Sequence, residues 1–584
     1  MKRLALSIIT SCTLASTTAQ QVSENIKINQ VGFYPDGPKL AIATNSSAKK
    51  FYLLGESKKD TAFKGTLIPT GTWEYSGETT SKADFSSFVK AGKYVLFVPG
   101  LGNSYPFEIA PKINENLGKA ALKTFYYQRV SVELLPEYAG KFARKAGHPD
   151  NEVLIHGSAQ SVKRPEGTKI SSPGGWYDAG DYNKYIVNSG ISTYTLLAAY
   201  EHYPAYFNSL KLNIPESKNE VPDILDESLV NVRWMLTMQD EDGGVYHKLT
   251  NANFDAFVMP DKAVSPRYVV VKTTAATNDF AAVMAQSARI FKKFSKQLPG
   301  LSDSCLKAAE KAYNWAKKNP GITYEQDQIS KSFAPAIVTG AYDDKNLTDE
   351  AQWAASELFV TTGKPEYFSE ANLKSTIGKF GVPGWQSVNT LALFSIVSNK
   401  TSAAIADIKS LETELLAIAD KYKNYALKKS EYGIPMGQSK DDFVWGSNST
   451  DANEGIILLM AYDLTKNKEY LNAAIAALDY LLGRNGTGYS YVTGFGGKPS
   501  IHPHHRPSEA DGITEPIPGF LVGGPNPGVQ DQSNCPDAKY PSTKPALAYL
   551  DHVCSYASNE IAINWNAPLV YLALGIEAIK AGQK

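Results

Sequence analysis

The stretch GKYVLFVPGLGNSYPFEIAPKI, residues 92–113, contains the change of local pattern that decides the fold. Up to Pro111 the chain consists of short segments rich in β-branched and aromatic residues, separated by Gly, Pro, Asn and Asp turns. Segments of this kind are IKINQVGF (26–33), KLAIAT (39–44) and KKFYLLG (49–55). Such a pattern is typical of antiparallel strands. It predicts a small β-sandwich over residues 22–110.

From residue 113 onward the apolar residues recur with a helical period. In EYLNAAIAALDYLLGRNG, residues 469–486, the apolar positions follow the i, i+3, i+4, i+7 pattern of one helix face. The same pattern recurs in further segments: 113–128, 188–202, 223–239, 275–293, 303–318, 350–362, 402–423, 453–463 and 559–580. About a dozen helices joined by long Gly- and aromatic-rich loops are therefore expected over residues 111–584, and such loops usually carry function.

The composition excludes one class of function and is compatible with another. The 584 residues suggest more than one domain, and 59 Lys and Arg residues balance 59 Asp and Glu residues. A nucleic-acid-binding protein needs a basic face for the phosphates, so we expect no nucleic-acid partner. The 33 Tyr and 8 Trp residues offer flat apolar faces that suit stacking on sugar rings as well as core packing.

The first residues, MKRLALSIITSCTLASTTAQQ, have the order of a secretory signal. Two basic residues precede a short apolar stretch and then small residues, which predicts a signal peptide over 1–19 with cleavage after Ala19. The apolar stretch is too short for a transmembrane anchor, so a secreted or periplasmic protein is expected. Lipidation at Cys12 is an open alternative, since residues 9–12 loosely resemble a lipoprotein cleavage site.

Cleavage leaves three cysteines, and export permits disulfides. Cys535 and Cys554 lie 19 residues apart in one loop-rich stretch, so we predict a disulfide between them. Cys305 lies on a predicted helix and is expected to be a buried free thiol. No C-x-x-C pair and no zinc-finger spacing occurs in the sequence.

Two aspartates stand three residues apart in GGWYDAGDYNKYIVNSG, residues 174–190. Asp178 and Asp181 have aromatic neighbours and almost no basic residue beside them. Like charges at close range destabilise each other unless a ligand, a metal or a reaction uses them. This segment alone favours a helix cap or a solvated turn over a functional pair.

A second acidic segment, YLDHVCSYASNEIAINWNAPLVYLAL, lies at residues 549–574 and contains Asp551 and Glu560. Glu560 precedes or begins an apolar helix, so a first-turn carboxylate that interacts with the helix dipole remains an alternative to a functional role. Between the two acidic segments, residues 488–508 hold three histidines and an arginine: His502, His504, His505 and Arg506. Their spacing does not suit tetrahedral zinc, whereas their donors suit sugar hydroxyls and an acidic neighbour.

Taken together, these segments resemble family 9 of the glycoside hydrolases, the cellulase class, in its subgroup with an N-terminal immunoglobulin-like domain. YSYVTGFGGKPSIHPHHR (489–506) and YLDHVCSYASNEIAINWNA (549–567) resemble the two family signatures, and WYDAGDYNKY (176–185) resembles the D-A-G-D segment. Further family-like segments are NQVGFYPDGPKLAI (29–42), WGSN (445–448), LLGRNGTGYSYVTG (481–494) and GGPNPG (523–528). The resemblance covers about residues 24–575. It implies an immunoglobulin-like β-sandwich over 22–110 followed by an all-α (α/α)6 barrel over 111–584.

The resemblance also implies an inverting mechanism with separate acid and base. Asp181 is the expected base that activates water, and Asp178 is expected to hold the same water and to orient Asp181. Glu560 is the expected acid, its pKa raised by apolar burial and by carboxylate neighbours. The acid and base of inverting enzymes stand roughly 6.5–9.5 Å apart.

The remaining signature positions fall on residues that assist the reaction or bind sugar. His504 matches the family's active-site histidine and Arg506 its arginine, both as expected substrate contacts. Asp551 takes the second acidic position and is expected to support the site through hydrogen bonds. Three aromatic residues stay open between sugar subsites and core packing: Trp176, Tyr182 and Trp445.

Metals are expected to play no part in the reaction. Many relatives with this domain order carry a zinc held by two Cys and two His ahead of the D-A-G-D segment. This chain has His148 and His156 there but no cysteine between residues 13 and 304, so that zinc site is expected to be absent. Structural calcium, frequent in the family, remains open.

The leading functional hypothesis is an exported endo-β-1,4-glucanase, a monomer that hydrolyses cellulose or mixed-linkage β-glucan. An exo-acting member of the same family, such as a cellobiosidase, β-glucosidase or exo-glucosaminidase, is the alternative within the same chemistry. In either case the partner is a β-glucan polysaccharide or oligosaccharide. A non-catalytic carbohydrate-binding protein is the alternative from another class, and the retained acid and base positions count against it.

Overall fold

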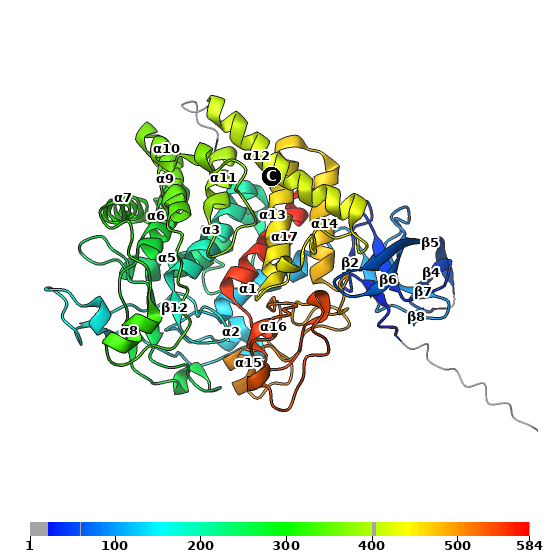
Figure 1. Cartoon of the computed structure of the whole chain (residues 1–584), viewed down its shortest axis with the longest axis horizontal. Helices are drawn as coiled ribbons and strands as arrows, with labels where there is room; N and C mark the ends of the chain where they lie inside the picture. The colour runs from blue at the N-terminus through cyan, green and yellow to red at the C-terminus, as the bar shows by residue number, and fades with distance from the viewer. Residues whose placement is uncertain (1–21, 59, 400–404, 583–584) are drawn as a thin grey trace, which may run out of the picture.

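The computed structural model describes residues 22–58, 60–399 and 405–582 (Figure 1). The predicted signal peptide and Cys12 lie outside the described residues. Figure 1 shows a β-domain at one end of an elongated molecule and a larger helical domain that makes up the rest. The change from strand to helix falls between Ile109 and Glu115.

The N-terminal domain is a β-sandwich, as expected. Its strands are β1 (Ile26–Ile28), β2 (Gly32–Phe33), β3 (Leu40–Thr44), β4 (Lys50–Gly55), β5 (Thr61–Trp73), β6 (Glu78–Asp84), β7 (Gly92–Val98), β8 (Gly102–Asn103) and β9 (Phe107–Ile109). They pair in the order β1-β3-β6-β5-β4-β7-β9-β2, with β8 beside β7. The long strand β5 pairs with β4 in its first half and with β6 in its second, and so joins the two layers. Aromatic and aliphatic side chains such as Phe33, Phe51 and Leu96 fill the space between them.

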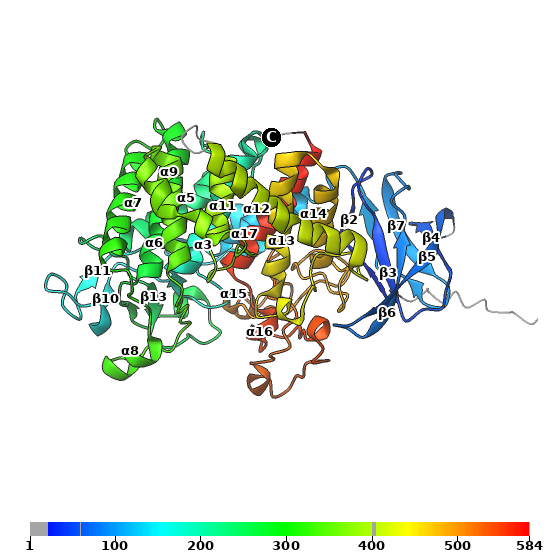
Figure 2. The ribbon, with the colours of Figure 1, turned by 45° about the horizontal axis from the view of Figure 1, so that its top comes forward.

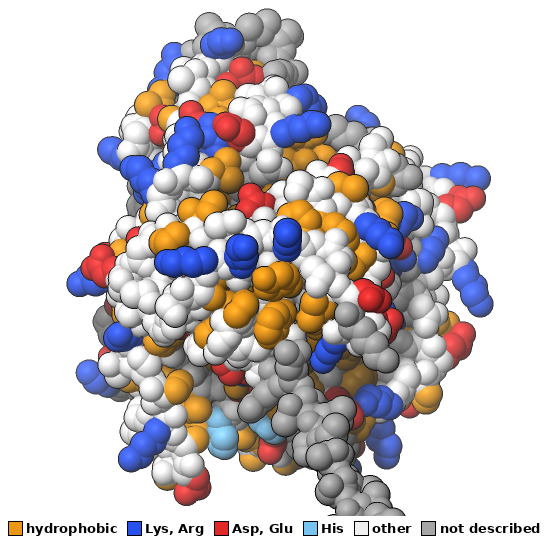
Figure 3. Space-filling model, turned by 90° about the vertical axis from the view of Figure 1, so that its right-hand side faces the viewer, with side chains coloured by type: hydrophobic (Ala, Val, Ile, Leu, Met, Phe, Trp, Pro, Cys, Tyr) orange, Lys and Arg blue, Asp and Glu red, His pale blue; other side chains and the backbone are white. Residues whose placement is uncertain are grey.

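The outer face of the sandwich domain has no single block of charge. Figure 3 shows Lys and Arg side chains spread among hydrophobic and acidic ones over this end of the molecule. This agrees with the balanced total of 59 basic and 59 acidic residues.

The C-terminal domain is an (α/α)6 barrel, as the resemblance implied. Its main helices are α1 (Glu115–Tyr127), α3 (Ile186–His202), α5 (Asp223–Thr237), α6 (Thr274–Phe291), α7 (Leu301–Lys318), α9 (Thr348–Thr362), α10 (Pro365–Ala371), α11 (Asn389–Ser398), α12 (Ile405–Asn424), α13 (Ser447–Thr465), α14 (Lys468–Leu481) and α17 (Ile563–Lys580). Helices α3, α6 and α17 are buried almost around their whole circumference, which places them in the inner ring. Helix α7 buries one stripe of small and aromatic residues and belongs to the outer layer. Figure 2 shows these helices packed side by side beside the sandwich.

A small sheet inside the helical domain was not predicted. It has the order β11-β10-β14-β13-β12, formed by β10 (Val153–Ile155), β11 (Lys169–Ile170), β12 (Lys184–Tyr185), β13 (Lys248–Asn251) and β14 (Arg267–Val269). These strands are two to four residues long, too short to show a period of two in the sequence. Because β12 directly follows the D-A-G-D segment, the sheet fixes that segment beside the barrel.

The two domains are joined by buried side-chain hydrogen bonds. Gln30 donates from Nε2 to the Gly488 carbonyl oxygen (2.7 Å), and its Oε1 accepts from the amides of Gly497 (2.9 Å) and Lys498 (2.7 Å). At the same interface the ring of Trp73 lies 4.4 Å from that of Tyr432, centroid to centroid. Residues 488–498 belong to the loop that leads to the predicted histidine segment, so the sandwich supports the base of that loop.

Candidate active site

A cleft of about 1210 Å³ lies at the loop end of the barrel. Five of the six residues expected to act in catalysis or binding line it: Asp178, Asp181, His504, Arg506 and Glu560. They come from three segments, at residues 178–181, 504–506 and 560, and the first lies more than 300 residues before the other two. Aromatic side chains line the same cleft, among them Trp385, Trp445, Tyr556 and Trp565.

Backbone pairing holds the three segments together. Ala179 forms an antiparallel bridge with Ala562, and His504 forms a parallel bridge with Glu560. The D-A-G-D segment passes close to the histidine segment at Gly180, where an added Cβ would lie 2.0 Å from the His504 carbonyl oxygen. Only glycine permits that approach, so the glycine of the D-A-G-D segment has a steric reason.

Glu560 does not lie on a helix, which decides between the two alternatives that the sequence left open, that it precedes or begins an apolar helix. Glu560 follows the short helix α16 (Tyr556–Asn559) and precedes α17, which begins at Ile563 rather than at residue 559. Residues 560–562 are extended because their backbone pairs with the other two segments. This pairing places the Glu560 side chain at the cleft rather than on a helix surface.

Asp178 is a buried carboxyl with two donors. Only 1% of the residue is exposed, which excludes a solvated turn, and the N-cap of the following helix α3 is Tyr185 and not Asp178. Asn188 Nδ2 donates to its Oδ1 at 2.7 Å, and the Tyr342 hydroxyl donates to its Oδ2 at 2.8 Å. Burial, with the nearby Asp181 charge second, raises the pKa of Asp178 to about 8. At neutral pH this carboxyl therefore carries a proton.

Asp181 is held as an acceptor beside the cleft. Asn183 donates to it from Nδ2 (2.7 Å) and from its backbone amide (3.3 Å), and the Tyr185 hydroxyl lies 3.4 Å from Oδ2. The completely buried ammonium of Lys248 lies 5.5 Å from the Tyr185 ring centroid. Desolvation lowers the pKa of Lys248 and the Asp181 charge raises it, so the two groups interact electrostatically.

Glu560 is the candidate acid by its environment. Burial raises the pKa of its carboxyl well above the usual range, and the Asp181 charge raises it further, while Arg506 acts in the opposite direction. The raised pKa of Glu560 that the sequence led us to expect thus comes from burial first and from the Asp181 charge second. A carboxyl of this kind stays protonated near neutrality and can give its proton to a leaving group.

His504 is neutral and presents one nitrogen to the cleft. Its Nδ1 lies 2.6 Å from the Val553 carbonyl oxygen, which can only accept, so Nδ1 carries the hydrogen. Burial lowers the pKa of His504 to about 4, and Nε2 is therefore a free acceptor at neutral pH. Arg506 donates to the Gly180 carbonyl oxygen at 2.9 Å and to that of Asp255 at 2.8 Å.

Asp551 does not line the cleft. Its carboxylate accepts from Ser500 Oγ (3.0 Å), from the amides of Ile501 and His502 (3.0 and 2.9 Å), and from Asn559 Nδ2 (3.1 Å). Asp551 thus ties the histidine segment to the segment that carries Glu560. This position suits the supporting role that the resemblance implied, rather than contact with sugar.

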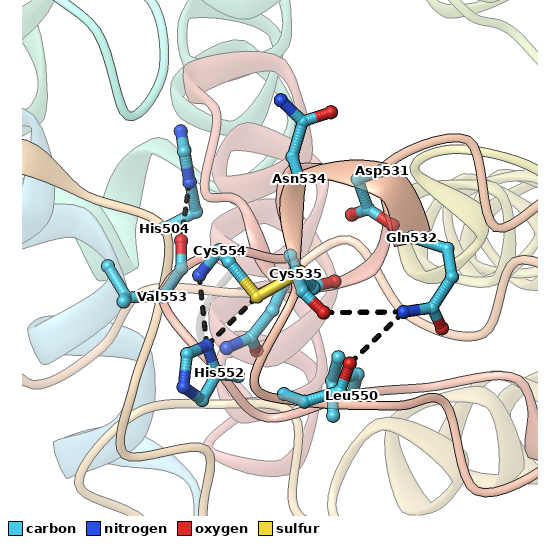
Figure 4. The surroundings of a disulfide bond; sticks show 12 residues. His504, Asp531, Gln532, Asn534, Cys535, Leu550, His552, Val553 and Cys554 are labelled. Atoms are coloured by element: carbon cyan, nitrogen blue, oxygen red, sulfur yellow. Dashed lines mark hydrogen bonds between the residues drawn. A yellow bond between two sulfur atoms is a disulfide. The ribbon is translucent and has the colours of Figure 1, made fainter.

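Cys535 and Cys554 are joined in a disulfide, with Cα atoms 5.3 Å apart (Figure 4). Figure 4 shows the disulfide close to Val553 and to the His504 ring, whose Nδ1 binds the Val553 carbonyl oxygen. The disulfide therefore anchors the stretch that fixes the His504 tautomer. Cys305 is a buried free cysteine.

The aromatic residues left open by the sequence divide into core and cleft. Trp176 (0% exposed) and Tyr182 (1%) belong to the core, whereas Trp445 is 44% exposed and lines the cleft. Sequence reasoning missed Asn188, Tyr342 and Lys248. Asn188 lies inside the segment 174–190 but was given no role there, and no local motif marks Tyr342 or Lys248, which only the fold brings to the carboxyl groups.

The two histidines in the region where many relatives bind zinc have other partners. His148 Nδ1 lies 2.7 Å from the Tyr177 hydroxyl, and His156 Nε2 lies 3.0 Å from the Pro335 carbonyl oxygen. Within residues 22–58, 60–399 and 405–582, no three His, Cys, Asp or Glu side chains form a group that could hold a metal ion.

Comparison with known proteins gives matches along almost the whole chain. The model of glycosyl hydrolase family 9 matches residues 115–573, and that of the cellulase N-terminal Ig-like domain matches residues 21–103. The xyloglucan-specific endo-beta-1,4-glucanase BoGH9A of Bacteroides ovatus is 46% identical over 581 residues, 98% of this chain and 97% of the relative. Endoglucanase D of Acetivibrio thermocellus is 34% identical, covering 97% of this chain and 82% of the relative. The solved structure titled Bacteroides ovatus GH9 has a TM-score of 0.89 at 44% identity, covering 95% of this chain and 99% of the other.

An (α/α)6 barrel with paired carboxyl groups in its cleft, preceded by an immunoglobulin-like sandwich, defines a glycoside hydrolase. The chain belongs to glycosyl hydrolase family 9, which confirms the resemblance seen in the sequence. The two relatives described above are endoglucanases, the members of the family are inverting hydrolases, and the family needs no cofactor for catalysis. In the part of the chain that the structure describes, no helix is long and apolar enough to cross a membrane.

Proposed function

We propose that the protein cleaves internal bonds of β-1,4-glucans, with Glu560 as the acid, Asp181 as the base and Asp178 as its partner. The observation that carries the assignment is the meeting of these three carboxyl groups in one large cleft, two of them with raised pKa values. Inverting hydrolysis needs one protonated and one ionised carboxyl on opposite faces of the sugar.

On the acid side, Glu560 gives its proton to the glycosidic oxygen as the bond to the anomeric carbon breaks. The raised pKa of Glu560 keeps that proton in place at neutral pH. After the reaction the Glu560 carboxylate recovers a proton from solvent, since the cleft is open to water. His504 Nε2 and the Arg506 guanidinium supply an acceptor and donors for sugar hydroxyls.

On the base side, Asp181 takes a proton from the attacking water while the water oxygen bonds to the anomeric carbon. The proton on Asp178 reduces repulsion within the pair, so that one carboxylate of the two is ready to accept. Tyr342 and Asn188 hold Asp178 in place, and Asn183 holds Asp181.

The substrate class follows from the cleft and the relatives. Aromatic side chains along the cleft provide stacking faces for several sugar rings, which suits a long chain bound at an internal bond. The B. ovatus relative is named for xyloglucan, a β-1,4-glucan with xylosyl branches on O6 of its glucosyl units. We propose xyloglucan as a substrate beside unbranched cellulose and mixed-linkage β-glucan.

Two variants test the roles of the acid and the base. Glu560→Gln is expected to lose about 10²- to 10⁴-fold in rate on β-glucans, and much less on aryl glycosides whose leaving group needs little protonation. Asp181→Ala is expected to fail on both substrates, because water attack is needed whichever group leaves. Asp178→Ala is expected to be impaired less than Asp181→Ala.

The product configuration tests the mechanism itself. NMR of the first product is expected to show the α-anomer from a β-linkage. A β-anomer would mean a covalent glycosyl-enzyme and would reject Asp181 as a water-activating base. Viscosity compared with reducing ends distinguishes endo from exo action: endo cleavage lowers viscosity early, whereas an exo-acting enzyme releases sugar at nearly constant viscosity.

We also propose a structural calcium ion at Asp279, on α6. Both carboxylate oxygens of this wholly buried residue lack a hydrogen-bond partner. Burial, with the Asp279 charge second, raises the pKa of Glu350 on α9, so the two carboxyl groups lie near each other. Calcium binds carboxylate oxygens together with backbone carbonyl oxygens and water, so the two carboxyl groups would supply only part of its ligands. Calcium is then expected to raise the melting temperature of the EDTA-treated protein but not that of Asp279→Asn. An equal response of both proteins would reject the site.

Export as a monomer completes the proposal. The N-terminal sequence and the Cys535–Cys554 disulfide both suit an oxidising compartment. Expression of the full chain with fractionation and light scattering is expected to give an exported monomer with a new N-terminus after Ala19. A lipid on Cys12 would instead retain the protein in the membrane fraction.

A further inference from the structure

A second, smaller cavity lies directly beside the catalytic cleft. It measures about 340 Å³, and Phe254 lines both cavities. The wall of the small cavity comes from the loop after β13 (residues 252–256), from Ser265 and Pro266, and from Tyr268 on β14. Its volume falls at the lower end of the range of about 300–1,000 Å³ typical of small-molecule sites.

The shared wall is tied to the binding machinery of the cleft. The Arg506 guanidinium lies 5.6 Å from the Phe254 ring centroid and donates to the Asp255 carbonyl oxygen at 2.8 Å. Phe254 is 48% exposed although it is a large apolar residue. A sugar held beside Arg506 therefore has an exposed aromatic ring at its flank, and the small cavity lies beyond that ring.

The chemistry of the small cavity suits a single sugar. Phe254 and Tyr268 offer ring faces, which pack against the C–H face of a pyranose. Asn253 is exposed at the wall and has both donor and acceptor groups. The Ser265 hydroxyl lines the same cavity, as does Asp255, whose carboxylate accepts from Asn251 Nδ2 at 2.9 Å. Apolar rings with a few polar groups are the usual composition of a carbohydrate pocket.

An unbranched glucan has no group that would reach sideways out of the cleft, whereas a glucan branched at O6 has one. We propose that the cavity lined by Asn253, Phe254 and Tyr268 binds a branch sugar of a β-1,4-glucan whose backbone occupies the cleft. This inference rests on the proposed function, and it assigns preference for branched substrates to the loop at residues 252–256.

Ala256→Trp tests the inference by filling the cavity from an exposed position of its wall. The variant is expected to lose about tenfold in kcat/KM on xyloglucan, a factor equal to roughly 1.4 kcal/mol of transition-state binding, and to keep its kcat/KM on mixed-linkage β-glucan within about twofold. Asn253→Ala is expected to show a smaller loss of the same selectivity. Val264→Trp is the matched control: Val264 is 85% exposed and lines neither cavity, so both substrates should be cleaved as by the wild type.

The outcomes separate the two proposals. Equal effects of Ala256→Trp on branched and unbranched glucans, or no effect on either, would overturn the branch site while leaving the glucanase function intact. A wild-type protein that cleaves neither polysaccharide would instead overturn the proposed function.

Discussion

Replacing Asp178 with Asn is expected to make the enzyme more stable, and increasingly so as the pH rises. The pKa of Asp178 is about 8 in the folded protein against an ordinary value of 3.8. Between these values the folded chain holds a proton that the unfolded chain has lost, so unfolding releases a proton. The stability of the wild type therefore falls with rising pH through this group, and Asn has no such proton.

The size of the effect follows from the pKa difference. About four pH units at roughly 1.4 kcal/mol per unit give a total of about 6 kcal/mol, which is fully developed only above pH 8. The amide nitrogen of the variant replaces one of the two carboxyl oxygens and therefore meets one donor, Asn188 or Tyr342, of which the Tyr342 hydroxyl can turn and accept. The mismatch costs about 1–3 kcal/mol at every pH, so it shifts the curve without changing its slope.

Calorimetry at several pH values between 5 and 8 measures this directly. The melting temperature of Asp178→Asn minus that of the wild type is expected to increase steadily over the range, while glucanase activity falls. Asp303→Asn removes an exposed carboxyl from α7 and is the control, with a difference that stays nearly constant from pH 5 to 8. A constant difference for Asp178→Asn as well would refute the assignment of a proton to Asp178.

Three further perturbations follow from contacts described above. Gly180→Ala is expected to lose nearly all activity and to lower the melting temperature, because its Cβ would lie 2.0 Å from a backbone oxygen; wild-type kinetics would show that the segments can separate. Exchange of Cys535 and Cys554 for Ser is expected to cost about 3 kcal/mol in unfolding experiments, the value for a loop of this length, and a reductant should destabilise only the wild type. Lys248→Met is expected to lower both stability and kcat, since it leaves buried acceptors unpaired beside the base, and unchanged values would show that the buried charge is dispensable.

The fold class and the candidate catalytic residues of the cleft could be predicted from the sequence, because both have local patterns. The change of period at Pro111 separates strands from helices, and the signature segments name Asp181, His504 and Glu560 directly. The family match and the barrel confirm the class, while the role of each residue stays a proposal.

The residues behind the catalytic carboxyl groups, Tyr342 and Lys248, have no local sequence pattern. Tyr342 binds Asp178 across 164 residues of sequence, and Lys248 lies in a four-residue strand that is too short to be recognised. The extended conformation of Glu560 was also out of reach, because it depends on pairing with two remote segments that override the helical tendency of the residues around it.

The hydrogen bonds of Gln30 to residues 488–498 show that the domain boundary at Pro111 does not separate two independent parts. The two parts of the chain look like independent modules in their composition, yet without the first module the loop that leads to His504 loses three hydrogen bonds, one of them buried and two part-buried. A barrel inherited alone would have to replace those bonds with water or with new side chains. In evolutionary terms the sandwich is thus a structural part of the hydrolase, and recombination at Pro111 would remove contacts that the catalytic domain uses.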